Sequence, residues 1–216
     1  QNHEISQTNT GEEIEPTQLA AIMLELQSLG CHNINLVSPT HVAPQILAAT
    51  LLAAQEGLRL PLVYNTGGYD SLVMLKLLDG VIDIYMPDMK YSNPNVALKY
   101  SKIRNYPQVN QSAVREMHRQ VGDLQIDENG VAIRGLLVRH LVLPYGISGT
   151  AQIVRFLAEE ISPGTYLNLM DQYRPDFNAR LYPRLTRSIT EQEYKAAVQL
   201  AHEAGLYRLD KKKAIY

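Results

Sequence analysis

The stretch NINLVSPTH, residues 33–41, decides the fold of this chain. Apolar residues recur at every second position from Ile34, which is the period of a β-strand. The run breaks at Ser38-Pro39, a dipeptide typical of a turn. A helical apolar pattern follows from Val42 to Gly57, and Thr40 is placed to cap that helix at its N-terminus. The stretch therefore predicts one strand that leads directly into one helix.

The same strand-and-helix unit recurs along the chain. Four further strands are predicted at Leu60–Asn65, Val81–Met86, Gly135–Leu143 and Thr165–Met170. A helical apolar pattern follows each of the first, second and fourth strands of the chain. Strands that alternate with helices predict an α/β fold with a parallel sheet covered by helices.

Other segments carry clear local signals. An amphipathic helix is predicted between Pro16 and Gly30, and another opens at Pro107 after an irregular stretch rich in Tyr, Asn and Pro. Asn129-Gly130 predicts a small β-hairpin insertion near residues 124–133. Thr190 and Glu193 form a capping box that begins a last helix.

Length and composition favour one ordinary globular domain. The 216 residues are 45% hydrophobic and 19% charged, with a net charge of −2, so we expect a single domain over residues 1–216, with residues 178–216 as a C-terminal extension. This charge predicts no nucleic-acid or membrane partner, and no apolar run has the length of a membrane helix. We expect a cytoplasmic protein. Cys31 is the only cysteine, so this chain alone predicts no disulfide framework.

Polar residues lie at the end of all five predicted strands. They are Thr40 and His41, Asn65 and Thr66, Asp88 and Lys90, Arg139 and His140, and Asp171 and Gln172. Barrels of parallel strands collect their working groups at such ends. Neither GxGxxG after the first strand nor GxxxxGK[ST] is present, so dinucleotide and P-loop sites have little support. The pattern favours a barrel over a doubly wound sheet.

The order of these motifs resembles the radical S-adenosylmethionine (SAM) superfamily, in its branch of iron–sulfur proteins like pyruvate formate-lyase activating enzyme. The likeness is carried in order by NINLVSPTHV, the turn Asn65-Thr66-Gly67-Gly68, IYMPDMKY, EMHRQVGDL, VRHLVLP and MDQYRP. Gln1 to Ser6 resembles the segment after the third cysteine of the family's CxxxCxxC loop. The resemblance implies a partial (β/α)6 TIM-like barrel, and we expect its first strand and cysteine loop to precede Gln1.

The activity implied by this resemblance is reductive cleavage of SAM at a 4Fe-4S cluster. The product is a 5′-deoxyadenosyl radical that abstracts hydrogen. The cluster ligands would lie outside this chain segment, so we expect the chain alone to be inactive. The implied partners are a glycyl-radical protein and an electron donor such as flavodoxin or ferredoxin.

The resemblance also implies which residues meet the cosubstrate, while it assigns no residue of this chain a catalytic or metal-binding role. The cofactor-binding positions are Ser38, Thr40, His41, Asn65, Thr66, Asp88, Lys90, Arg139, Asp171 and Gln172. Lys90 is placed to reach the methionine carboxylate. Arg139 and His140 alternate along a strand, and we expect Arg139 to face the site.

Two other functions are compatible with the sequence. Pro39 stands where the family has a glycine, and Asn65 stands where it has a carboxylate. These departures favour a barrel without a cluster that serves as a binding or regulatory module. A mononuclear metal hydrolase that uses His41 and Asp88, with Lys90 near the metal, is the weaker alternative. Asp83, in the middle of an apolar strand, is interpreted as a paired interior carboxylate that stabilises the barrel and not as a catalytic base.

Overall fold

The protein is described by a computed structural model covering residues 11–210, which form parts of two compact units. Within the described residues, one unit combines residues 11–34 with 41–60, and the other combines residues 35–40 with 61–210. The predicted likeness of Gln1 to Ser6 lies outside the described residues. No helix in the described part is long and apolar enough to cross a membrane.

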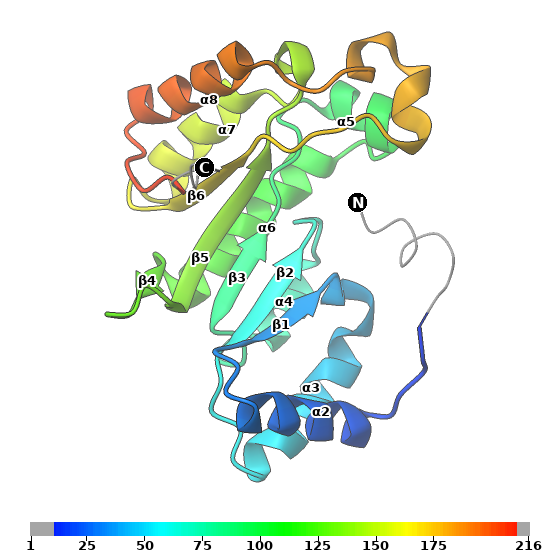
Figure 1. Ribbon diagram of the computed structural model, residues 1–216, viewed down its shortest axis with the longest axis vertical. Coiled ribbons are helices and arrows are strands. Elements are labelled where there is room, and N and C mark those ends of the chain that lie inside the picture. The colour runs from blue at the N-terminus through cyan, green and yellow to red at the C-terminus, as the bar shows by residue number, and fades with distance from the viewer. Residues whose placement is uncertain (1–10, 211–216) are drawn as a thin grey trace. The chain divides into compact units, whose positions relative to one another are not determined.

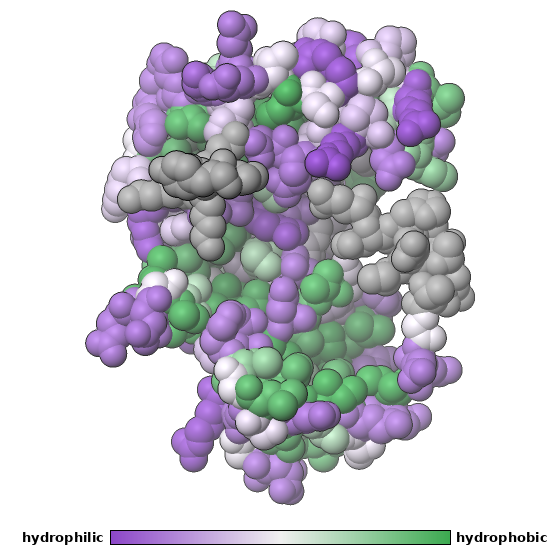
Figure 2. Space-filling view, in the orientation of Figure 1, coloured by the Kyte–Doolittle hydropathy of each residue, from purple (hydrophilic) through white to green (hydrophobic). Residues whose placement is uncertain are grey.

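The first unit is a pair of helices, α2 (Pro16–Ser28) and α3 (Ala43–Gln55), that pack against each other. Small side chains allow this close packing, since Ala49 and Ala53 of α3 are fully buried. Gln27 joins the segment after α3, because its side chain donates to the Gly57 carbonyl at 3.1 Å and accepts from the Arg59 N–H at 2.6 Å. Figure 2 shows apolar side chains on the visible face of this helix pair.

The second unit is built on a sheet of parallel strands (Figure 1). These are β1 (Ile34–Val37), β2 (Leu62–Thr66), β3 (Ile84–Pro87), β5 (Ala132–Leu141) and β6 (Tyr166–Met170). They lie side by side in chain order, and β2–β3, β3–β5 and β5–β6 pair in parallel. The carboxyl ends of these strands therefore share one edge, as predicted.

The α/β fold with a parallel sheet is confirmed. Within the described residues β1 and β6 are the two ends of this parallel series, so closure into a (β/α)6 barrel stays a prediction. Fully buried side chains from neighbouring strands, such as Tyr64, Tyr85 and Leu136, form its core. The Tyr64 and Tyr85 rings meet edge to face with centroids 5.7 Å apart.

Helices follow the strands in the second unit. They are α4 (Leu72–Leu77), α5 (Pro94–Ser101), α6 (Tyr106–Val121), α7 (Thr150–Phe156) and α8 (Glu191–Glu203). Helix α6 packs against β3 and β5, and α7 packs against α8. The stretch that includes α5 was predicted to be irregular, and this is wrong. Asn93 caps the helix by accepting from the Asn95 and Val96 N–H groups, with Pro94 at the first helical position.

The hairpin near residues 124–133 is confirmed. Strand β4 (Gln125–Ile126) pairs antiparallel with the beginning of β5. For this reason β5 begins at Ala132, whereas the sequence predicted its start at Gly135. The Asp127 carboxylate stabilises the turn by accepting from the Asn129 and Val131 N–H groups at 2.9 and 2.8 Å.

One predicted helix cap is wrong and one is confirmed. Thr40 lies inside a short 3₁₀ helix, η1 (Pro39–Val42), and α3 begins only after it, with Val42 as its N-cap residue. The Thr40 hydroxyl binds a carboxylate instead, as described below. Thr190 and Glu193 form the predicted capping box of α8.

Candidate functional site

The carboxyl ends of β3 and β5 meet in an ion cluster formed by Asp88, Lys90 and Arg139, the Asp88 cluster. Nε and Nη2 of Arg139 lie 2.9 and 2.7 Å from Asp88 Oδ1, and Lys90 Nζ donates to Asp88 Oδ2. The Asp88 side chain is only 12% exposed, while Lys90 is 44% exposed. Lys90 is therefore the member that a ligand can reach.

The end of β2 is joined to this cluster through its backbone. The Asp88 N–H donates to the Thr66 carbonyl at 2.9 Å. The Ser38 N–H in turn donates to the Asn65 carbonyl at 2.8 Å. Three strand ends that the sequence predicted as site positions are thus neighbours.

Two buried side chains of α6 hold the turns after β2 and β3 together. The Tyr106 hydroxyl accepts from the Lys90 N–H at 3.0 Å and lies 3.0 and 3.1 Å from the Gly67 and Asp88 carbonyls. Asn110 Nδ2 donates to the Gly68 and Asp88 carbonyls, both at 2.9 Å. Burial raises the pKa of Tyr106 far above its usual value, so its phenol stays neutral.

A second cluster, the Asp70 cluster, consists of Thr40, Tyr64, Thr66 and Asp70. The Thr40 and Thr66 hydroxyls donate to the two Asp70 oxygens at 2.7 and 2.8 Å, and the Tyr64 hydroxyl lies 3.2 Å from Oδ1. Asp70 is 2% exposed. Burial, and then the Asp70 charge, raise the pKa of Tyr64, so this phenol donates.

Sequence reasoning missed Asp70, Tyr106 and Asn110. Asp70 lies in a loop four residues after Thr66, where an acidic residue normally indicates solvent exposure. The sequence feature that could have indicated these residues is the Thr66-Gly-Gly turn, because the polar backbone groups of a buried turn need hydrogen-bond partners nearby.

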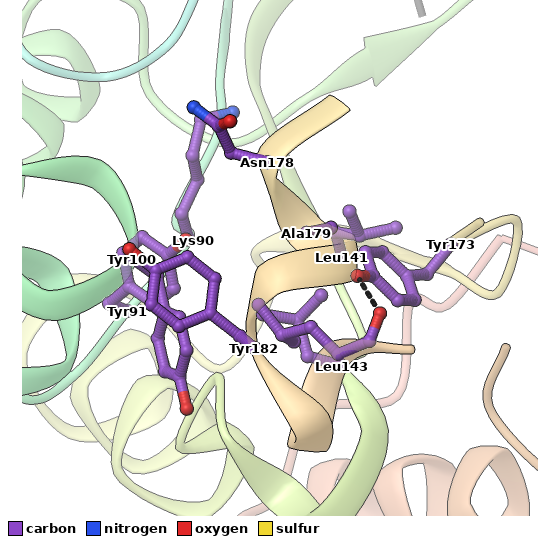
Figure 3. Close-up of a pocket in the computed structure, with 10 residues that line it drawn as sticks. Lys90, Tyr91, Tyr100, Leu141, Leu143, Tyr173, Asn178, Ala179 and Tyr182 are labelled. Atoms are coloured by element: carbon purple, nitrogen blue, oxygen red, sulfur yellow. Dashed lines mark hydrogen bonds between the residues drawn. The ribbon is translucent and has the colours of Figure 1, made fainter. Parts of the chain in front are cut away.

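A cavity of about 210 Å³ opens beside the Asp88 cluster, and four of its ten lining residues are tyrosines, so we call it the tyrosine cavity. In Figure 3, Tyr91, Tyr100 and Tyr182 lie opposite Leu141, Leu143 and Tyr173. The Lys90 side chain lines the same cavity. One cation thus links the Asp88 cluster to an aromatic surface.

His140 turns away from this cluster, as the alternation along the strand predicted. Its Nδ1 lies 2.6 Å from the Met89 carbonyl, which can only accept, and its Nε2 lies 3.0 Å from the Thr150 hydroxyl. Burial lowers the pKa of His140 to about 4. A neutral ring that donates from Nδ1 satisfies both contacts.

The other predicted positions differ in how far they are exposed. Ser38 and His41 are exposed, and Asn65 is buried within β2. Gln172 is exposed after β6, and Asp171 beside it is partly buried. Asp83 lies just before β3, where its carboxylate accepts from the Leu62 N–H at 2.9 Å and approaches Arg134 at 4.0 Å. Asp83 is thus paired, as predicted, but its side chain is 38% exposed, so the predicted interior position is wrong.

A metal cluster needs several ligating side chains close together. Between residues 11 and 210, no three His, Cys, Asp or Glu side chains are grouped so that they can hold a metal ion. The single cysteine, Cys31, is partly buried.

Comparisons with known proteins support the fold. No family model matches the chain. It is 28% identical over 194 residues to an uncharacterized protein of Methanocaldococcus jannaschii, in an alignment that covers 88% of this chain and 52% of that protein. The chain therefore spans about half the length of the curated relative it matches.

The fold is similar to the crystal structure of a domain of pyruvate-formate lyase-activating enzyme from Bacteroides vulgatus, with a TM-score of 0.58. The match covers 83% of this chain and 99% of that domain at 11% sequence identity. At this identity the comparison shows a common α/β fold of parallel strands and helices.

Proposed function

We propose that this chain is the SAM-binding part of a radical enzyme similar to pyruvate formate-lyase activating enzyme. The observation that carries the proposal is the convergence of β2, β3 and β5 at the Asp88 cluster, in a fold similar to a domain of such an enzyme. Ligands of parallel α/β folds bind at the carboxyl ends of the strands.

In this proposal Lys90 binds the carboxylate of the cosubstrate. Its ammonium group has three hydrogens, and Asp88 occupies one of them. Because Arg139 also pairs with Asp88, the three side chains together carry one net positive charge, and Lys90 can attract an anion. Tyr106 fixes the Lys90 backbone and thereby the direction of its side chain.

The tyrosine cavity accepts the planar part of the cosubstrate. Its volume of about 210 Å³ is below that of a complete cofactor pocket, roughly 300–1,000 Å³. It therefore holds one ring system. Stacking of a base on an aromatic side chain contributes about 1–3 kcal/mol, and the tyrosines that line this cavity are Tyr91, Tyr100, Tyr173 and Tyr182.

The residues of this chain do not fit a 4Fe-4S cluster. Such clusters are held by cysteine thiolates, and the sequence contains only Cys31. When bound, the cluster supplies the electron for cleavage of the cosubstrate. The proposal for these 216 residues is therefore binding and orientation, and radical formation requires cysteines from outside them. A glycyl-radical protein and a flavodoxin or ferredoxin are the partners we propose for the whole enzyme.

Calorimetric titration with SAM tests the binding step. We expect binding by the wild-type chain and at least tenfold weaker binding by Lys90→Met, because one charge-assisted hydrogen bond is lost. Lys195→Met, on the exposed face of α8, is the matched control and should bind normally. Equal affinity of all three proteins would contradict the assignment of Lys90.

The radical step needs the complete reading frame. After anaerobic expression, reconstitution with iron and sulfide, and reduction, we expect 5′-deoxyadenosine to form. SAM binding without cleavage would favour the module without a cluster. No described group of side chains supports the metal hydrolase.

A further inference from the structure

A larger cavity, of about 490 Å³, also has Tyr100 in its lining. Its walls come from the loop after β3, helix α5, the loop after β5, the start of α7 and, through Arg184, the short 3₁₀ helix η5 (Pro183–Leu185). It therefore lies outside the carboxyl ends of two adjacent parallel strands, where α/β folds bind ligands. Tyr100 also lines the tyrosine cavity shown in Figure 3, so the two cavities share a wall.

The charged side chains that line this larger cavity are both cationic. They are Lys99 and Arg184, and no carboxylate lines the cavity. Neither cation forms an ion pair with a carboxylate of residues 11–210. The nearby Glu193 is already neutralised by Arg187, whose two terminal nitrogens lie 2.8 Å from its oxygens. The cavity therefore carries two positive charges without a carboxylate partner in the described chain, and Lys99 Nζ lies 5.3 Å from the centroid of the Tyr100 ring.

The Arg184 guanidinium is held in place. Its Nη2 donates to the Tyr145 carbonyl at 3.2 Å, and its central carbon lies 5.4 Å from the centroid of the Tyr145 ring. Tyr145 itself has a left-handed backbone with φ 60°, which is strained for a residue with a side chain. The Tyr145 N–H donates to Glu193 at 2.7 Å, and this bond helps to hold the strained turn.

The loops that form the cavity are also tied to each other. The Ser92 N–H donates to the Ser148 carbonyl at 3.1 Å. Gly149, with φ +73°, leaves room for the Ser92 hydroxyl, and a Cβ at that position would overlap with it. Arg184 is joined to the loop after β5 by its bond to the Tyr145 carbonyl, and that loop is joined to the loop after β3, so its position does not depend on a ligand.

We propose that the larger cavity binds a small organic anion, with a carboxylate or phosphate group held by Lys99 and Arg184 and an apolar or aromatic body against Tyr100 and Val96. Two cations without carboxylate partners favour an oxyanion. The exposed Gln152 side chain adds a neutral donor and acceptor at the edge. The inference depends only on this cavity and is independent of the function proposed above.

Titration with benzoate, phenyl phosphate and the neutral analogue benzamide, followed by protein NMR, tests the proposal. We expect both anions to shift the signals of α5 and of the loop after β5, and benzamide to leave them unchanged. Benzoate alone would indicate a carboxylate ligand, and phenyl phosphate alone a phosphate. Lys99→Met and Arg184→Gln should each weaken anion binding about tenfold, since each removes one charge-assisted hydrogen bond.

Lys195→Met is the matched control, because Lys195 is an exposed helical lysine that does not line the cavity. Arg184→Gln also removes the hydrogen bond from Arg184 to the Tyr145 carbonyl. For this reason the acetylation rates of two lysines are measured in the wild-type chain as well. The anions should slow acetylation of Lys99 by acetic anhydride and leave acetylation of Lys195 unchanged. The proposal is overturned if benzamide binds as well as the anions, or if Lys99 reacts at the same rate with and without them.

Discussion

Arg139 and Asp88 form an ion pair across β5 and β3, with two guanidinium nitrogens 2.9 and 2.7 Å from the same carboxylate oxygen. Both side chains are largely shielded from water, since they are 25% and 12% exposed. Loss of one partner from such a pair leaves the other charge poorly compensated. The pair therefore stabilises the sheet at its carboxyl edge as well as orienting the candidate site.

We expect Arg139→Met to lower the free energy of unfolding by about 1–3 kcal/mol, because Asp88 then keeps only Lys90 as a cationic partner. Urea unfolding followed by circular dichroism measures the loss. The double variant that combines Asp88→Asn with Arg139→Met should lose less free energy of unfolding than the sum of the losses of the two single variants. Simple additivity would show that the two side chains do not interact.

Gly68→Ala should destabilise the protein by more than about 2 kcal/mol. Gly68 has φ +75°, and a Cβ there would overlap with the Asp88 carbonyl and the Asn110 amide. Gly67→Ala is the matched control, because nothing lies within 4 Å of a Cβ at that position. Thermal unfolding of both variants measures the contrast, and similar melting temperatures would refute the packing described for this turn.

Asp70→Ala should cost about 2–4 kcal/mol, because the buried hydroxyls of Tyr64 and Thr66 and the partly buried hydroxyl of Thr40 lose their common acceptor. Asp79→Ala, which removes an exposed ion pair with Arg119, is expected to cost less than about 1 kcal/mol. Guanidinium unfolding of the two variants provides the comparison. A loss for Asp70→Ala no larger than for Asp79→Ala would mean that the Asp70 cluster contributes little to stability.

His140 should make stability fall in mild acid. Burial lowers its pKa to about 4 in the folded protein, whereas an unfolded histidine has a pKa of about 6.5. Between these values the unfolded chain binds more protons, so the free energy of unfolding rises with pH. From pH 7 to pH 5 the wild type should lose on the order of 1–2 kcal/mol more than His140→Gln does.

Urea unfolding at both pH values measures this difference. The variant is less stable at each pH because it disturbs the contacts with Met89 and Thr150. The informative quantity is therefore the change with pH within each protein. Equal pH dependence in the two proteins would show that His140 titrates normally in the folded state.

The sequence alone determined the order and type of most elements. Apolar residues at every second position specify a strand because side chains alternate between the faces of a sheet. Apolar residues at every third or fourth position specify a helix because side chains at that spacing lie on one face of it. Turn chemistry acts within a few residues as well, so the Asn129-Gly130 hairpin and the Thr190–Glu193 cap were predicted correctly. The α5 helix was missed because its cap, Asn93, lies in a polar stretch without a clear apolar stripe.

The partners of the site residues were decided only by the tertiary structure. Thr40 binds Asp70, 30 residues later, in place of the helix N-terminus that its local sequence suggested, and Arg139 reaches Asp88 across 51 residues. Such contacts depend on which strands become neighbours, and a local pattern contains no information on that choice. A buried carboxylate and an exposed one look the same in sequence, since only the surrounding fold removes the water and supplies the donors.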